Sequence, residues 1–547
     1  IAVPLLLGLL AGGLSAQTET GQITGAVTDA SGAAIPAAHV AVRSVGTGSV
    51  RNANTSADGT YTITNLLPGE YTVTVTMTGF ATAEHKLTLT VGSRAGQDFR
   101  LEVASASATV DVTESSTQVN TETQTVGQVV NQEQIRELPN LTRNPYQFVA
   151  LAGNVSDAGL GTRGAGFSIN GQRESSTNIL LDGGSNNDEY NGNIGQQVPL
   201  DAVQEFSVLT SNFTAEYGRA SGGIVNVVTK SGSNDFHGTA YEFNRVSALS
   251  SNSFQNNATG QPKSVFARNQ FGYSAGGPAI KNKLFFFSST EWIRIRSNAI
   301  TFAWVPTPDL IAQTPSNVQS FFKAYGQLRP SASILGTVSR SQLPTDPCVG
   351  LPCASLSPSL PLFNHVAFSV PTDAGGGNPQ NTWMTVNRID YNLSDRTQIY
   401  GRYALYSEVD ATGGLSFSPY DNYDLGQTFY NHNGLASVIH TFSPAWVSQS
   451  KVVFNRLTNV QPGTTSRGIV PTMYAYTSGT VAIGQDNIGF PGYNPFTPGN
   501  GGAAGGPQNL LQLYEDMNYI RAGHAFRFGG TYVHQRDNRT FAAYQTA

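Results

Sequence analysis

Charge, cysteine and long apolar runs are all scarce in this sequence. Only 12% of its 547 residues are Asp, Glu, Lys or Arg, and the formal net charge is -5. With no basic block to neutralise phosphates, the sequence excludes nucleic acid as a partner. After the first residues, no window holds the ~20 uninterrupted apolar residues that a membrane-spanning helix needs. Any passage through a membrane must therefore use β-strands.

The chain has two cysteines, Cys348 and Cys353, in the segment CVGLPC. Their spacing could close a small disulfide in an oxidising compartment. A zinc site would need further ligands nearby, and the eight histidines are scattered. The segment GLGTRG fits a dinucleotide fingerprint only in letters, because no strand precedes it and no helix follows it. We expect no metal, no cofactor and no catalytic site.

The first residues, IAVPLLLGLLAGGLSAQ, form a short apolar run followed by small residues. This pattern is typical of the core and cleavage region of a secretory signal, here residues 1–16 with a cut near Ala16. The alternative is a buried strand or helix of the first domain. No Met or basic segment precedes the run, so we expect the signal to be incomplete at its N-terminus. The pattern predicts export.

What is abundant is Gly, Asn, Ser, Thr and Tyr, a composition that favours strands and turns. In residues 17–103 short strands are separated by turn signals such as Asp58-Gly59. Within EYTVTVTM, Tyr71, Val73 and Val75 share one face of a strand. These residues predict a small β-sandwich of about seven strands.

Residues 104–120 contain almost no large side chains and predict an exposed linker. Within it, TVDVTE (residues 109–114) is a short β-prone island. Such an island can add as a strand to the sheet edge of another protein. The alternative interpretation is an ordinary linker.

Residues 121–232 change to a mixed α/β pattern rich in glycine. The segment EYGRASGGIVNVVTKSG places an apolar strand after a glycine pair, Gly222 and Gly223. We interpret the pair as a hinge that permits positive φ or a close approach of the backbone. Replacing either glycine with Val, or inserting residues at 231–233, is expected to disturb how this domain is seated.

From residue 233 to 547 strands alternate in polarity and helical signals nearly vanish. In TQIYGRYALYSEVD, Tyr403 and Leu405 face one way and Arg402 and Glu408 the other. Long Gly, Pro, Asn and Ser-rich loops, notably 301–380 and 461–508, separate the hairpins. Short turns alternating with long loops predict a transmembrane β-barrel. A soluble β-sandwich or propeller is the alternative.

Three sets of residues carry a family resemblance. SADGTYTITNLLPGEYTVTV resembles the transthyretin-like carboxypeptidase regulatory-like domain, a fold associated with carbohydrate binding. SINGQRESSTNILLDGG, EYGRASGGIVNVVTKSG and RNQFGYSAGGPAI resemble TonB-dependent outer-membrane receptors, in particular the Oar-like branch. The resemblance implies a mainly β protein: a periplasmic sandwich, an α/β plug (residues 121–232) and an antiparallel barrel in Gram-negative outer-membrane lipid. The length after residue 233 provides only about ten to thirteen strands, so we expect an incomplete barrel.

The resemblance also implies a mechanism and its partners. An extracellular ligand binds the plug and loops, and TonB, driven by ExbB and ExbD, engages the linker and displaces the plug. The TonB-box candidate consists of Thr109, Val110, Asp111, Val112, Thr113 and Glu114. The chain is expected to be a receptor that imports its ligand and not an enzyme.

Candidate ligand contacts in the plug offer charge and an aromatic face, which suits an oligosaccharide, a peptide or a chelate. They are Arg163, Arg173, Asp188, Glu189 and Tyr190. Each of them could instead hydrogen-bond the plug to the barrel. Two other functions stay open: a surface carbohydrate-binding or adhesive protein without transport, and an exported hydrolase with an accessory sandwich.

Overall fold

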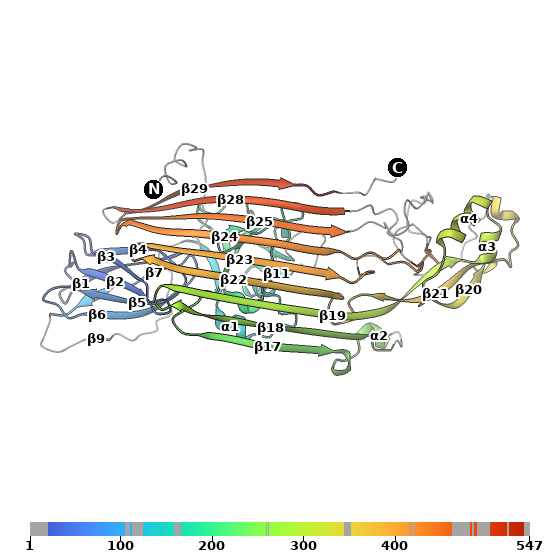
Figure 1. Cartoon of the computed structure of the whole chain (residues 1–547), viewed down its shortest axis with the longest axis horizontal. Coiled ribbons are helices and arrows are strands. Elements are labelled where there is room, and N and C mark those ends of the chain that lie inside the picture. Colours follow the sequence, from blue (N-terminus) through green and yellow to red (C-terminus); the bar gives the residue numbers. More distant parts are fainter. Residues whose placement is uncertain are drawn as a thin grey trace.

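The computed structural model describes most of the chain, in three successive bodies that we call the sandwich, the plug and the wall (Figure 1). The described residues are 20–103, 110–111, 124–157, 166–258, 260, 262–343, 352–414, 417–421, 423–461, 482–483, 486–489, 504–521 and 524–540. Among them, no helix combines the length and the apolar character needed to cross a bilayer.

The sandwich packs two sheets face to face, in the orders β4-β1-β7 with β8 beside β1, and β3-β2-β5-β6-β9. As the alternation predicts, Val73 and Val75 of β5 are fully buried between the sheets. The strands are β1 (Gly21–Asp29), β2 (His39–Ser44), β3 (Val50–Asn54), β4 (Thr60–Leu66), β5 (Gly69–Thr76), β6 (Ala83–Leu89), β7 (Arg94–Gly96), β8 (Phe99–Leu101) and β9 (Val110–Asp111).

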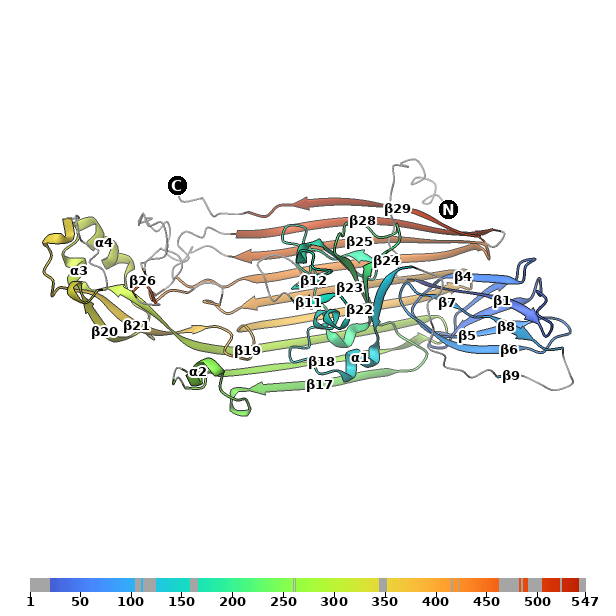
Figure 2. The same cartoon turned by 180° about the vertical axis from the view of Figure 1, so that it is seen from behind.

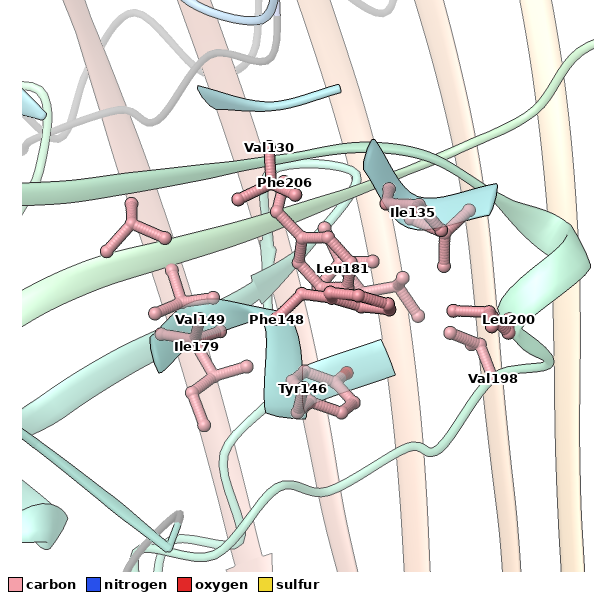
Figure 3. Packing of buried hydrophobic residues seen from close by; sticks show 14 of the residues in the cluster. Val130, Ile135, Tyr146, Phe148, Val149, Ile179, Leu181, Val198, Leu200 and Phe206 are labelled. Carbon is pink, nitrogen blue, oxygen red and sulfur yellow. The ribbon is translucent and has the colours of Figure 1, made fainter. Parts of the chain in front are cut away.

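The plug is built on a five-stranded sheet in the order β10-β15-β16-β13-β14. Its central strand β16 pairs antiparallel with β15 and parallel with β13, and all of its residues are buried. Phe206, Phe148 and Tyr146 fill the core against this sheet (Figure 3). The elements are β10 (Val126–Val130), α1 (Gln132–Glu137), η1 (Pro145–Leu151), β11 (Val155–Asp157), β12 (Phe167–Ile169), η2 (Glu174–Ser176), β13 (Thr177–Leu181), β14 (Gly184–Ser185), η3 (Leu200–Ala202), β15 (Val203–Ser211) and β16 (Gly223–Thr229).

The wall is a long antiparallel sheet that lies behind the plug in the view of Figure 2. Its strands follow one another in chain order, with β17 and β29 at the two edges, so the described wall is an open sheet. They are β17 (His237–Val246), β18 (Val265–Ile280), β19 (Leu284–Pro306), β22 (Gln380–Ser394), β23 (Thr397–Asp410), β24 (Thr428–Ser443), β25 (Trp446–Gln461), β28 (Ala504–Arg521) and β29 (His524–Asp537).

Polarity across the wall is the reverse of that in a soluble sheet. In β25, Val452 is 47% exposed on the outer face, while its neighbour Lys451 is 1% exposed on the inner face. The same alternation turns Tyr403 of β23 outward and buries Arg402 against the plug, as the sequence predicts. An apolar outer face with a polar inner face is the pattern of a sheet that stands in lipid.

The two ends of the wall differ. At one end the strands are joined by short connections, residues 281–283, 395–396 and 444–445, and the sandwich lies at this end (Figure 1). At the other end the connections are long. Short turns mark the periplasmic end of outer-membrane barrels and long loops the extracellular end.

The segment predicted as a loop from residue 301 to 380 is instead largely folded. β19 extends beyond the other strands and pairs with β21, which pairs with β20. Phe321 and Phe322 of an amphipathic helix pack on Phe368 and Val366 of this sheet, which gives the lobe its own core. The elements here and in the neighbouring loops are η4 (Ser247–Leu249), α2 (Phe254–Ala258), α3 (Pro308–Ala312), α4 (Ser316–Tyr325), β20 (Ser333–Ser339), η5 (Arg340–Gln342), η6 (Pro352–Ser355), β21 (Pro361–Pro371), β26 (Ala482–Ile483) and β27 (Asp486–Asn487).

Candidate functional site: the plug and its seat in the wall

A buried carboxylate joins the plug to the wall. Asp182 follows β13, is 0% exposed, and accepts a hydrogen bond from the backbone N–H of Thr229 at the end of β16 (2.8 Å). Its other oxygen accepts from Nε of Arg402, on wall strand β23, at 2.8 Å. The carboxylate therefore holds the ends of two plug strands against one wall strand.

A second wall arginine extends this contact. Arg388 of β22 forms a bidentate ion pair with Asp390 and donates a hydrogen bond to the carbonyl oxygen of Thr229 (3.2 Å). Its Nη1 lies 4.0 Å from Asp182. Because both acids and both arginines are buried and hydrogen-bonded, their charges are compensated without water. We call Asp182, Arg388, Asp390 and Arg402 the ion lock.

A further charged contact lies near the first wall strands. Glu291 of β19 is buried and accepts hydrogen bonds from Nε of Arg143 in the plug (3.3 Å), the hydroxyl of Tyr241 (2.9 Å) and the amide of Gln270 (2.9 Å). Arg143 also pairs with Asp201. One plug residue of each charged contact, Arg143 and Asp182, has a positive φ, which is uncommon outside glycine and often marks a functional site.

Side-chain amides of the wall complete the edge of the plug sheet. The backbone N–H of Ser185 in edge strand β14 donates to Gln512 of β28 (2.9 Å). Its carbonyl oxygen accepts from Asn455 of β25 (2.6 Å) and from Gln512 (3.0 Å). An edge strand needs partners for its backbone groups, and here polar wall residues provide them.

The sequence-predicted ligand residues Asp188, Glu189 and Tyr190 lie together in the loop after β14. Asp188 forms a bidentate ion pair with Arg539 (2.7 and 2.8 Å), and the Arg539 guanidinium lies 4.9 Å from the ring centre of Tyr190. Glu189 pairs with Arg219 of the plug. In this conformation the ion pairs of Asp188 and Glu189 hold the loop to Arg539 and Arg219.

The two arginines of the same prediction lie apart from this loop. Arg173 is exposed just before η2. Arg163 lies outside the described residues. The structure therefore brings together three of the five predicted ligand residues.

Gly222 immediately precedes β16 and Gly223 is its first residue, and neither has a positive φ. A Cβ on Gly223 would lie 2.8 Å from the carbonyl oxygen of Leu209 and 2.8 Å from Cδ1 of Ile169. Close backbone approach, rather than an unusual backbone angle, is the reason for glycine at 223.

The TonB-box candidate is described only in part. Val110 and Asp111 form β9, which pairs parallel with Ala83 and Glu84 of β6 at the edge of the sandwich. Thr109, Val112, Thr113 and Glu114 lie outside the described residues, as does Cys348. The side chain of Cys353 is likewise not described, so the disulfide stays a prediction.

The ion lock was not predicted from the sequence. Asp182 lies within the quoted LLDGG segment, and Arg402 within a strand whose alternation points it inward. The available signal was a set of charged residues at inward-facing positions of wall strands, since such residues need a partner inside the barrel.

A lipid-facing antiparallel wall whose polar inner face is covered by a domain of the same chain defines a plugged outer-membrane barrel protein. Family models match all three bodies: the carboxypeptidase regulatory-like domain at residues 22–102, the TonB-dependent receptor plug domain at 119–224 and the outer membrane beta barrel domain at 228–547. The last match covers more than half of the chain. The chain therefore belongs to the outer membrane beta barrel family, and its plug makes it a TonB-dependent receptor of the Gram-negative outer membrane.

Among curated proteins, the chain is 28% identical over 303 residues to the TonB-dependent transporter Oar of Myxococcus xanthus. The match covers 52% of this chain and 28% of the length of that relative. Receptors and transporters of this kind are not enzymes, in agreement with the expectation from the sequence.

The solved structures that match the chain share little sequence with it. A mutant of the ferric enterobactin receptor of Pseudomonas aeruginosa matches with 14% identity and a TM-score of 0.43, over 75% of this chain and 48% of that one. The outer membrane transporter YddB of Escherichia coli matches with 13% identity and a TM-score of 0.45, over 75% and 48%.

Proposed function

We propose that this receptor binds an extracellular ligand and imports it with energy relayed by TonB, ExbB and ExbD. The observation that carries the proposal is the way the plug is seated. Its contacts with the wall include the ion lock and side-chain amides, as well as apolar contact with Phe287, Val386 and Ala404. Polar contacts can be exchanged for contacts with water at a modest net cost. A plug held in this way can be displaced by force and can return.

The segment at 109–114 is the proposed attachment point for TonB. Recognition of a short extended segment by strand addition depends on main-chain hydrogen bonds. A proline removes one of these N–H donors and also restricts the residue before it.

The test compares Val110→Pro with Ser105→Pro, a matched change in the same linker but outside the six residues. Val110→Pro should abolish binding of a peptide spanning residues 104–120 to the C-terminal domain of TonB and stop ligand uptake by the receptor in cells. Ser105→Pro should leave both unchanged. If Val110→Pro leaves uptake unchanged, TonB-driven transport is refuted and an adhesive function becomes the better explanation.

The ligand class is proposed as an oligosaccharide, a peptide or a chelate. Asp188, Glu189 and Tyr190 offer charge and an aromatic face beside Arg539 and Arg219, so a ligand would have to compete with these pairs. Uptake by cells with and without the receptor, measured with labelled members of each class, identifies the class. Loss of uptake in only one class is the supporting result.

A further inference from the structure

The sandwich is attached to the plug by a buried carboxylate. Glu205 lies in β15, is 5% exposed, and accepts a hydrogen bond from the backbone N–H of Val91 in the turn after β6. Val91 is buried as well. A buried carboxylate needs such a donor, because leaving it without one costs free energy. Separation of the two domains would leave both groups in need of water.

The sandwich is also attached to the wall, at the end with the short connections. Asn518 of β28 donates a hydrogen bond to Oδ1 of Asn65 (2.6 Å). Arg51 donates to Gln398 of β23 (3.2 Å) and also contacts Thr441 of β24. These contacts involve three wall strands, so the sandwich spans a wide section of the wall.

One wall residue contacts all three bodies. Arg527 of β29 forms an ion pair with Glu216 of the plug (2.5 Å) and donates hydrogen bonds to Gln22 of the sandwich (3.4 Å) and to Asn518 of its own wall (3.0 Å). The backbone N–H of Gln22 in turn donates to Ser93, in the same turn as Val91. The plug and wall contacts of the sandwich therefore share one small region of it.

A cavity of about 1030 Å³ lies between the three bodies. Tyr71 of the sandwich, Leu200 of the plug and Tyr400 of the wall are among its lining residues. The sandwich thus forms one side of a partly open chamber instead of packing continuously on the plug. Its apolar contact with the wall includes Leu67, which packs on the cluster around Tyr400.

We propose that the sandwich is a releasable clamp on the periplasmic side: while docked, it fixes the plug relative to the wall and forms one side of the chamber between them. Its hydrogen bonds can be replaced by water when it leaves, so the docked and released states can be close in free energy. The clamp itself is independent of TonB. Its consequence for transport, that release precedes movement of the plug, rests on the proposed function.

The clamp is tested by hydrogen exchange of the full chain in detergent without TonB. Glu205→Leu removes the acceptor for Val91, whereas Glu205→Gln keeps an acceptor of the same size. At pH 5, where the carboxyl group of the docked Glu205 is still protonated, exchange in β15 and in the turn 90–93 should rise about tenfold in Glu205→Leu and stay near wild type in Glu205→Gln. Exchange in β17, a wall strand that does not pair with β15, should not change in either variant and reports that the wall is folded.

A second pair of variants tests the clamp from the wall. Arg527→Ala should also raise exchange in the turn 90–93, while Arg536→Ala, at an exposed position of the same strand, should not. Unchanged exchange in both Glu205→Leu and Arg527→Ala would overturn the clamp. A receptor that fails to bind TonB but shows these exchange effects would refute the proposed transport and leave the clamp intact.

Discussion

At the residue scale, a side chain at position 223 would collide with the backbone of the plug. A Cβ there lies 2.8 Å from the carbonyl oxygen of Leu209, whereas at Gly222 the nearest atom is Cβ of Gln172 at 3.3 Å. Gly223→Ala should destabilise the plug by about 1–3 kcal/mol, the usual cost of overpacking. Gly222→Ala should cost much less. Urea titration followed by hydrogen exchange in β16 measures both, and equal effects would contradict this assignment.

The carboxyl group of Glu205 should make docking of the sandwich depend on pH. Burial raises its pKa from 4.5 to about 7, and the hydrogen bond from Val91 opposes this shift. The docked state then holds the proton more tightly than a released state in which Glu205 has its ordinary pKa. Docking is therefore strongest below pH 4.5 and weakens as the pH rises through 7, by about 3 kcal/mol in all.

Glu205→Gln provides the control for this prediction. It cannot ionise and retains an acceptor for Val91, so docking should stay strong at pH 8 and show no dependence on pH around 7. Hydrogen exchange in the turn 90–93 between pH 5.5 and 8.5, corrected for the intrinsic exchange rate, measures the difference. Parallel pH profiles for the two proteins would show that Glu205 is not the responsible group.

At the element scale, the ion lock joins the ends of β13 and β16 to β22 and β23. Asp182→Asn should leave the buried guanidinium of Arg402 without a compensating charge and destabilise the plug by about 3–5 kcal/mol. Asp188→Asn removes an acid whose partner, Arg539, retains Asp537, so its effect should be below about 1 kcal/mol. The plug stabilities of the two variants are compared by the urea concentration at which the plug amides begin to exchange. A similar loss of plug stability in both variants would show that the ion lock contributes no more to stability than the pair of Asp188 and Arg539.

Local patterns in the sequence were enough to predict individual strands. The apolar run at 224–228 indicates a fully buried strand, and β16 is the centre of the plug sheet. The alternation around Arg402 and Tyr403 indicates which face turns inward. These predictions succeed because successive side chains of a strand point to opposite faces of the sheet. The two environments therefore appear as an alternation between neighbouring residues in the sequence.

Contacts between distant segments could not be predicted in this way. Asp182 and Arg402 are 220 residues apart, and no local pattern specifies their pairing. The folded lobe within residues 301–380 was not predicted, for a related reason. Its core brings together Phe321 and Phe368, which are separated by a segment whose glycine and proline content is typical of loops. Of the candidate site, composition indicated residues 188–190 as candidates for ligand contact but not their partner Arg539.

At the scale of the whole molecule, the reversed polarity of the wall should make its outer face intolerant of charge. Val452 is exposed near the middle of β25, and Val460 is exposed on the same face near the end of that strand, beyond the exposed Arg456. Val452→Lys should cost about 2–4 kcal/mol, and Val460→Lys about 0–1 kcal/mol, because the cost falls with distance from the bilayer centre. The yield of folded receptor in isolated outer membranes measures this, and equal yields would contradict the assignment of a lipid-facing surface.

The connection between the plug and the wall limits how far the plug can travel. β16 ends at Thr229 and β17 begins at His237, so only residues 230–236 join them. Fully extended, this leash spans about 25 Å. A wall strand such as β25, with 16 residues, is about 50 Å long. A plug that stays folded can therefore shift by only about half the length of a wall strand. A larger displacement requires residues of β16 or β17 to leave their sheets first.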